Sequence, residues 1–175
     1  MNTYLNDKLV AEDSIIEAWE LLSEDYEEWT EALLELYQDK LDWKLISENN
    51  EIIWNKSMLE KFKERIHWDV LSKKVVNEQI TDELLEIFKD KWDWEELSAN
   101  WHLEFSLEVI DKFADYWDWE NLISHNCRVN PYDDDPIGFY EKFKNYIPQH
   151  RLKNSKLWWS IVDKRKEELL SSIKS

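Results

Sequence analysis

Four segments of the sequence share one pattern: LDWKLIS (residues 41–47), IHWDVLS (66–72), WDWEELS (92–98) and WDWENLI (117–123). They place a tryptophan at intervals of 25, 26 and 25 residues, at Trp43, Trp68, Trp94 and Trp119. The segment AWELLS (18–23) puts Trp19 in the same position 24 residues earlier. Five matches at one period indicate an internal repeat, and a period of about 25 residues is typical of stacked supersecondary units.

A second series of segments follows the same period and has helical periodicity. Its members LLELYQDKL, MLEKFKERI, LLEIFKDKW, VIDKFADYW and FYEKFKNYI share an aromatic residue, at Tyr37, Phe62, Phe88, Phe113 and Phe143. Apolar residues at offsets 0, 1, 4 and 8 form one helical stripe. Three residues before each segment stands Thr30, Asn55, Thr81, Ser106 or Pro136. The first four are good N-caps, and Asp135 can cap a helix that begins at Pro136.

Each repeat is therefore predicted to be a short helix of about 7 residues, a linker and an amphipathic helix of about 11, neither stable alone. Stacking buries the apolar stripes, so the sequence predicts an all-α fold, an α-solenoid of about five two-helix repeats. We expect one domain over 1–175, with an N-terminal cap over 1–18, repeats over 19–147 and a C-terminal cap helix within 148–175. The cap helix is expected to pack through Trp158, Ile161, Val162, Leu169 and Ile173.

The W-D-W-x-x-L-S core, as in residues 92–98, resembles that of tryptophan-rich short helical repeat proteins, a largely uncharacterised group from bacteria and large DNA viruses. The resemblance covers residues 19–147. It implies the fold and no particular activity, because repeat scaffolds serve many roles. Some units depart from the pattern: the Asp is replaced by Ala18 and His67, and Gln149 replaces the tryptophan of the last unit.

The composition favours helices and a soluble, cytoplasmic protein. One Gly and three Pro in 175 residues are few for the many tight turns of a β-rich fold. Cys127 is the single cysteine, which excludes an intrachain disulfide and is typical of a reducing compartment. We expect neither a signal peptide nor a membrane span, since no stretch approaches about 18 continuous apolar residues.

The charge is strongly acidic and unevenly distributed. Of the net charge of −17, residues 1–60 carry −12, residues 61–130 carry −7 and residues 131–175 carry +2. This sign disfavours direct binding to nucleic acid or to an anionic membrane. A protein partner with a basic surface is therefore expected.

The densest acidic run is the first candidate site. It comprises Glu24, Asp25, Glu27, Glu28, Glu31, Glu35 and Asp39. Such a run is usually a solvated face. Repulsion among so many acids lowers the stability of the fold, however, which favours a functional role for their negative electrostatic field.

Two functions are consistent with these features. The first is a non-enzymatic helical scaffold whose acidic N-terminal half binds a basic protein surface. The second is a nucleic-acid-mimicking inhibitor of a DNA- or RNA-binding protein, of the phage or mobile-element anti-defence type. The sequence also predicts a weak head-to-tail contact between copies, in which the acidic half meets a basic C-terminal stretch comprising Lys153, Lys156, Lys164, Arg165 and Lys166.

The segment HNCRVNPYDDDPIG (125–138) interrupts the repeat and is the second candidate site. The spacing from Phe113 to Phe143 is 30 residues, so this link carries five extra. Inserted loops often carry function, and three adjacent carboxylates, Asp133, Asp134 and Asp135, suit a divalent cation. The calcium-loop pattern fails, and a turn with an N-cap is the simpler interpretation.

No catalytic, metal or cofactor site is expected. His125 lies near Cys127 without an oxyanion-hole loop, and His102 with Glu104 lacks the P-C-x-x-C segment of a zinc deaminase. Nine of the twelve tryptophans fall in repeat positions and are expected in the core, whereas Trp101, Trp158 and Trp159 are out of register.

Overall fold

The computed structural model describes residues 2–76, 79–124 and 130–174, with side chains from residue 11 onward. The described residues form twelve α-helices and no strand, which confirms the predicted all-α repeat fold. The chain divides into two compact units, Met1–Lys74 (unit 1) and Val75–Ser175 (unit 2).

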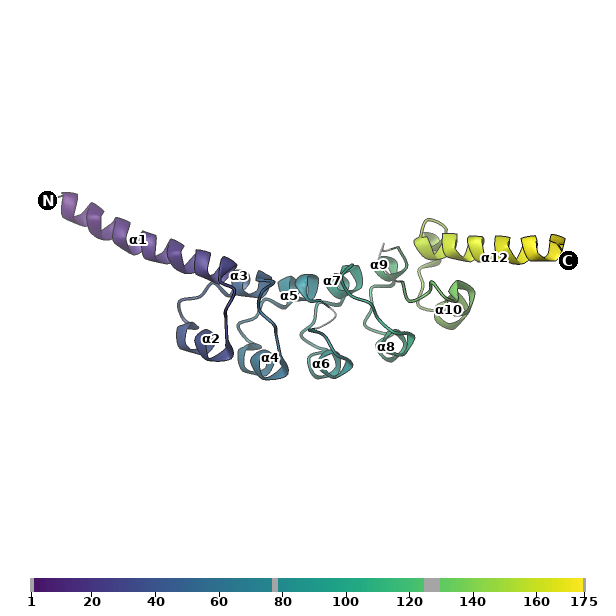
Figure 1. Cartoon of the computed structure of the whole chain (residues 1–175), viewed down its shortest axis with the longest axis horizontal. Coiled ribbons are helices and arrows are strands. Elements are labelled where there is room, and N and C mark those ends of the chain that lie inside the picture. The colour runs from purple at the N-terminus through teal and green to yellow at the C-terminus, as the bar shows by residue number, and fades with distance from the viewer. Residues whose placement is uncertain (1, 77–78, 125–129, 175) are drawn as a thin grey trace. The chain divides into compact units, whose positions relative to one another are not determined.

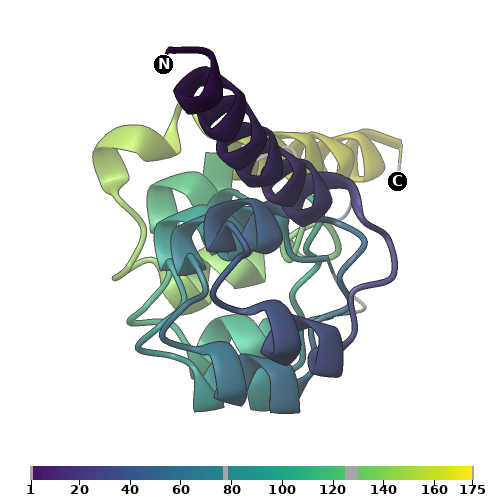
Figure 2. The ribbon, with the colours of Figure 1, turned by 90° about the vertical axis from the view of Figure 1, so that its left-hand side faces the viewer.

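Unit 1 contains five helices in two layers. They are α1 (Asn2–Asp25), α2 (Glu31–Tyr37), α3 (Trp43–Glu48), α4 (Lys56–Phe62) and α5 (Trp68–Lys74). In one layer α3 packs against α1 and α5 packs against α3. The other layer holds α2 and α4, which Figures 1 and 2 show below the first layer and joined to it by extended linkers.

Unit 2 repeats this arrangement. Its helices are α6 (Asp82–Ile87), α7 (Trp94–Ala99), α8 (Leu107–Lys112), α9 (Trp119–Ser124), α10 (Pro136–Phe143), α11 (Gln149–Leu152) and α12 (Lys156–Lys174). α7 packs against α9, and α12 packs against both α9 and α10. α6, α8 and α10 form the second layer (Figure 1).

The predicted helix caps are confirmed. The side chains of Thr30, Asn55, Thr81 and Ser106 each accept a hydrogen bond from the backbone N–H three residues later. Asp135 accepts one from Gly138 N at 2.9 Å, with Pro136 as the first helical residue. These bonds satisfy N–H groups that the first turn of a helix leaves without a partner.

The repeat tryptophan joins consecutive helices in two ways. Its ring packs on the shared aromatic of the next repeat, with centroids 5.0–5.2 Å apart and planes tilted by 36–41°, in the pairs Trp19–Tyr37, Trp43–Phe62, Trp94–Phe113 and Trp119–Phe143. Its indole N–H donates to the carbonyl five residues earlier, at the end of the preceding helix, with distances of 2.8–2.9 Å for Trp43, Trp68, Trp94 and Trp119. Gln149, which replaces the last tryptophan, donates from Nε2 to Lys144 O at 3.1 Å. The substituted unit thus keeps the hydrogen bond.

The serine of the W-x-x-L-S core joins successive repeats. The Oγ atoms of Ser23, Ser47 and Ser98 donate to the carbonyl of the tryptophan four residues earlier, at 2.6–2.7 Å. Each Oγ also accepts from the backbone N–H that precedes the next tryptophan, at 2.9–3.1 Å, in Asp42, His67 and Asp118. Ile123 holds this position in the next repeat, where the residue that would donate is Pro148, which has no N–H.

The helices differ from the prediction in three respects. The amphipathic helices have 6–8 residues instead of about 11, because the chain turns away directly after the shared aromatic. α1 runs through Trp19 without a break at residue 18, where Ala18 replaces the capping Asp of later repeats. The expected packing of the C-terminal cap helix is wrong for its second half: Trp158, Ile161 and Val162 are half-buried beside buried Leu157, whereas Leu169 and Ile173 are exposed.

We expect Trp119→Ala to lower the free energy of unfolding by about 3–5 kcal/mol, since the ring is buried between repeats. Trp159→Ala is the matched control, and its effect should stay within about 0.5 kcal/mol because its ring is 60% exposed. Denaturant unfolding followed by circular dichroism measures both. Equal losses would contradict the stacking described above.

Ser98→Ala should cost about 1–3 kcal/mol, because it leaves the backbone N–H of Asp118 without its acceptor. Ser14→Ala is the control: Ser14 Oγ also donates to a helix carbonyl, that of Ala11, but on an exposed surface. Ile123→Ser should destabilise instead of restoring the link, since Pro148 offers no N–H. A gain in the midpoint of unfolding for Ile123→Ser would show that the serine position is not set by the next repeat.

Candidate partner-binding cleft

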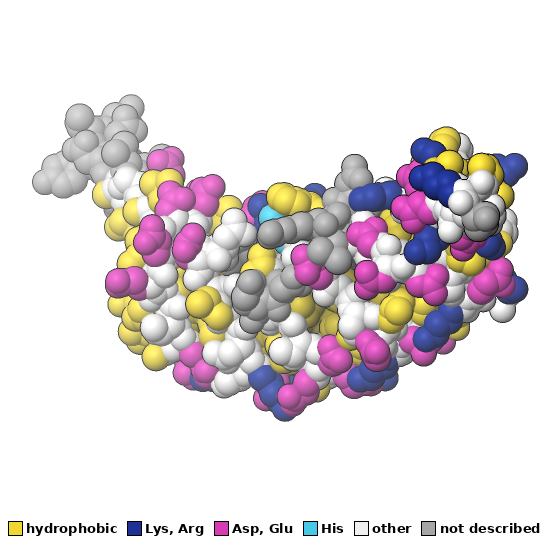
Figure 3. Space-filling view, turned by 45° about the vertical axis from the view of Figure 1, so that its right-hand side comes forward, with side chains coloured by type: hydrophobic (Ala, Val, Ile, Leu, Met, Phe, Trp, Pro, Cys, Tyr) yellow, Lys and Arg dark blue, Asp and Glu magenta, His cyan; other side chains and the backbone are white. Residues whose placement is uncertain are grey.

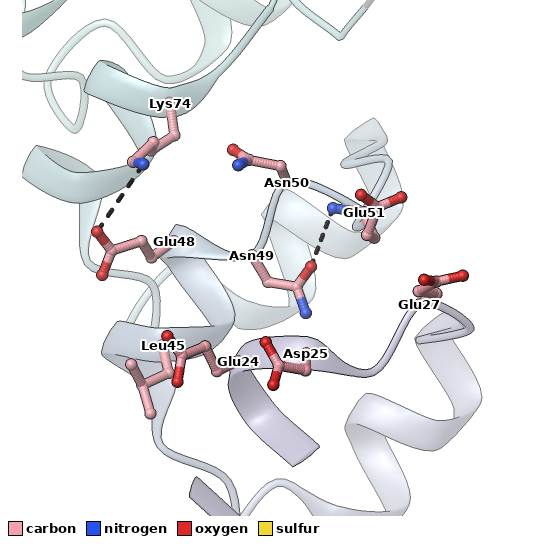
Figure 4. A pocket seen from close by; sticks show the side chains of 9 residues that line it. All are labelled: Glu24, Asp25, Glu27, Leu45, Glu48, Asn49, Asn50, Glu51 and Lys74. Atoms are coloured by element: carbon pink, nitrogen blue, oxygen red, sulfur yellow. Dashed lines mark hydrogen bonds and ion pairs between the residues drawn. The ribbon is translucent and has the colours of Figure 1, made fainter. Parts of the chain in front are cut away.

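A cleft of about 420 Å³ in unit 1 gathers acidic side chains from separate segments (Figure 4). The end of α1 and the residues after it supply Glu24, Asp25 and Glu27. α3 and the residues after it supply the next group, comprising Leu45, Glu48, Asn49, Asn50 and Glu51, and α5 supplies Lys74. We term this site the acidic cleft.

Buried Asn49 holds the two walls of the acidic cleft together. Its Nδ2 donates to Ser23 O and Tyr26 O, both at 3.2 Å, at the end of α1. Its Oδ1 accepts from Glu51 N at 2.9 Å. A buried amide with both ends bonded is rigid, because moving it would leave polar groups unsatisfied. The carboxylates on the two walls are therefore held at fixed backbone positions.

The balance of charge in the cleft is acidic. Five carboxylates line it, and Lys74 is the one lining cation. Lys74 Nζ lies 3.9 Å from Glu48 Oε1, and both side chains are more than a third exposed, so this pair is weak. Four carboxylates thus have no cation among the lining residues, and their field extends into the cleft.

The repeat itself does not require this acidity. Asn100 in unit 2 is the counterpart of Asn49: its Nδ2 donates to Val75 O at 2.8 Å and its Oδ1 accepts from His102 N at 2.9 Å. In register with the tryptophans, the counterparts of these acids are not acidic: Lys73 and Lys74 match Glu24 and Asp25, and Ala99 and His102 match Glu48 and Glu51. The asparagine link is thus part of the fold, whereas the carboxylates belong to unit 1 alone among these matched positions.

The structure divides the predicted acidic run. Glu24, Asp25 and Glu27 line the cleft, and Glu28 is exposed beside it in the chain. The remaining three pair with α4 and the turn after it: Lys61 Nζ lies 2.7 Å from Glu31 Oε1 and 2.9 Å from Glu35 Oε2, and Arg65 Nη2 lies 2.6 Å from Asp39 Oδ1. These three acids share two cations of the next repeat, and none of them lines the cleft.

Two lining acids, Glu48 and Glu51, were not predicted from the sequence. They follow Trp43 by five and eight residues, as Glu24 and Glu27 follow Trp19. The repeat period therefore places both pairs at the same end of neighbouring helices. Reading the acids in register with the tryptophans, instead of as one continuous run, finds them.

The second candidate site is partly explained by its hydrogen bonds. Asp135 caps α10, and Asp133 accepts from the backbone and side chain of Asn130 at 2.9–3.1 Å. Asp134 lies at the edge of a separate cavity of unit 2 with Asp135 and Lys142. The bonds of Asp133 and Asp135 belong to the expected turn and N-cap. His125 and Cys127 lie outside the described residues.

Other classes of site find little support in the described part of the chain. There, no group of three or more His, Cys, Asp or Glu side chains is placed to hold a metal ion. No described helix is both long and apolar enough to cross a membrane. Comparison of the chain with protein-family models, with curated proteins and with solved structures gives no match.

The pKa of Glu31 is lowered from its ordinary value of 4.5, chiefly by the hydrogen bond from Lys61. A lowered carboxyl pKa means that the ion pair stabilises the fold above that ordinary value and is lost as the pH falls through the lowered one. We therefore expect Lys61→Met to flatten the acid-side fall in melting temperature, measured by circular dichroism over a pH series. Lys63→Met, an exposed control two residues away, should leave the profile unchanged. Identical profiles for wild type and Lys61→Met would contradict a role for this pair.

Proposed function

We propose that the protein is a non-enzymatic helical-repeat scaffold that binds a basic protein surface through the acidic cleft. The observation that carries this proposal is the convergence of five carboxylates from two walls of unit 1, with one cation among the lining residues. Attraction between a cationic side chain and several fixed carboxylates speeds encounter and selects the sign of the partner.

The chemistry of the cleft suits lysine or arginine side chains in an extended basic segment. Its lining is mainly polar, with Leu45 as the one apolar residue, so an apolar ligand would find little area to bury. The carboxylates lie on a rigid framework, so binding them needs little ordering. The cleft is open enough to admit more than one basic side chain.

A lysine-rich peptide is the probe for this proposal. The triple variant Glu24→Gln, Glu27→Gln, Glu51→Gln removes three cleft charges while keeping side-chain size. The matched control Glu31→Gln, Glu35→Gln, Asp39→Asn removes three charges from the ion-paired surface of α2. Both variants have the same net charge, so only the location of the lost carboxylates differs.

We expect the cleft variant to weaken peptide binding at least about tenfold, equivalent to about 1.4 kcal/mol, and the control to change it about twofold or less. Isothermal titration calorimetry at low salt measures both. Higher salt should weaken wild-type binding, because the Debye length shrinks from about 10 Å at 0.1 M to about 3 Å at 1 M. Equal weakening by the two variants would refute the cleft as the site and would instead favour a field spread over the whole face, as a nucleic-acid mimic requires.

A further inference from the structure

Helices α1 and α12 both expose apolar side chains. A helix face that meets water is usually polar. In α1, Ile15 and Ile16 are each 58% exposed and Leu21 is 60% exposed. In α12, Leu169 is 65% exposed and Ile173 is 80% exposed. Exposed aliphatic residues clustered on one helix indicate a contact surface.

One face of α12 carries a continuous stripe, in which Trp158, Ile161, Arg165, Leu169 and Ile173 follow one another at intervals of three or four residues. Trp158 and Ile161 are half-buried, whereas the last three are exposed. With their neighbours they form a mainly apolar patch on the surface of α12. On α1, Ile15, Ile16 and Trp19 border a groove of about 450 Å³. Each helix therefore offers apolar side chains to a partner.

Neither exposed segment is held by contacts within its own unit. Residues 11–18 of α1 and residues 163–174 of α12 are exposed throughout. Most of the stability of a helix in a protein comes from packing of its apolar face, and these segments lack that packing. A partner that covers the apolar faces of these two segments would therefore stabilise both helices.

The charges of the two surfaces are complementary. Residues 11–25 of α1 carry six acids and no base, whereas α12 carries five bases and three acids. Figure 3 shows acidic side chains on the described part of α1, at the left, and Lys and Arg side chains beside hydrophobic ones on α12, at the upper right. Like surfaces would repel, since two copies of residues 11–25 would bring twelve acids together. A contact of α1 with α12 is therefore favoured over a symmetric one.

We propose that the exposed stripe of α12 in one molecule packs against the exposed face of α1 in a second copy of the chain. Each helix would then pack on two neighbours, since α3 already packs on α1 within unit 1 and α12 already packs on α9 within unit 2. It is heterologous, so each molecule uses two different surfaces and the association extends from copy to copy unless the geometry closes a ring. Burial of the apolar stripe supplies the attraction, and the opposite charges set the pairing.

Two variants of the full chain test this directly. The first, Ile15→Gln with Ile16→Gln, disables the face of α1. The second, Leu169→Gln with Ile173→Gln, disables the stripe of α12. All four residues are exposed, and glutamine is neutral and favours helix, so circular dichroism should show unchanged folding. Leu36→Gln with Ile53→Gln is the matched control, at residues 69% and 74% exposed elsewhere in unit 1.

Sedimentation velocity over an approximately hundredfold dilution series measures the average mass, which rises with concentration if the chains associate. We expect the wild type and the control to grow in average mass with concentration, and each variant alone to remain monomeric. An equimolar mixture of the two variants should reach twice the monomer mass and stop there, because one intact α12 and one intact α1 remain. A wild type that is monomeric throughout, or a single variant that dimerises alone, would overturn the proposal. Dimerisation of a single variant would indicate a symmetric contact between like surfaces.

Discussion

The hydrogen bond from the repeat indole to the end of the preceding helix is the interaction on which the rest of the structure depends. A helix of six to eight residues leaves its last carbonyls without intrahelical partners, so it needs a donor from outside. The indole N–H of Trp43 supplies one to Gln38 O at 2.8 Å, and its ring covers Phe62 of the next repeat. One side chain thereby ends one helix, begins the next and packs on the one after it. Without this link the short helices would have no fixed register.

The sequence was a reliable guide wherever the determining contact is local. Caps such as Thr30 and Asp135 act over three residues, and the tryptophan bond acts over five, so a short window contains all participants. The surroundings of α1 and α12 could not be predicted in this way. Both helices have the periodicity of packed helices, and only the structure shows that the partner of that face is not within their own unit. Hydrophobic pattern specifies that a face is to be covered but not by what.

The acidic run illustrates the same limit for the candidate site. In sequence, Glu24 to Asp39 is one block, but it spans the end of α1, a linker and α2, which lie in different layers. The acids on α2 lie beside a cation one repeat later, as with Glu35 and Lys61, which balances part of their charge. The acids before α2 instead join Glu48 and Glu51, one repeat later in the other layer. Which acids act together is thus decided by the repeat period and not by adjacency in the chain.

Residues that depart from the repeat pattern show which features the fold requires and which it does not. Gln149 replaces a tryptophan and restores its hydrogen bond, so that change is compensated. Ile123 replaces a serine where Pro148 has no N–H to donate, and a different hydrogen bond, from the buried Tyr132 hydroxyl to Ile123 O at 3.2 Å, joins this repeat to the inserted segment. The carboxylates of the acidic cleft are different. Asn100 keeps the same link in unit 2 without acids at the matching positions, so the link does not require Glu24 or Glu51, whose mutual repulsion costs stability. A costly feature that the fold does not require is best explained by what binds there.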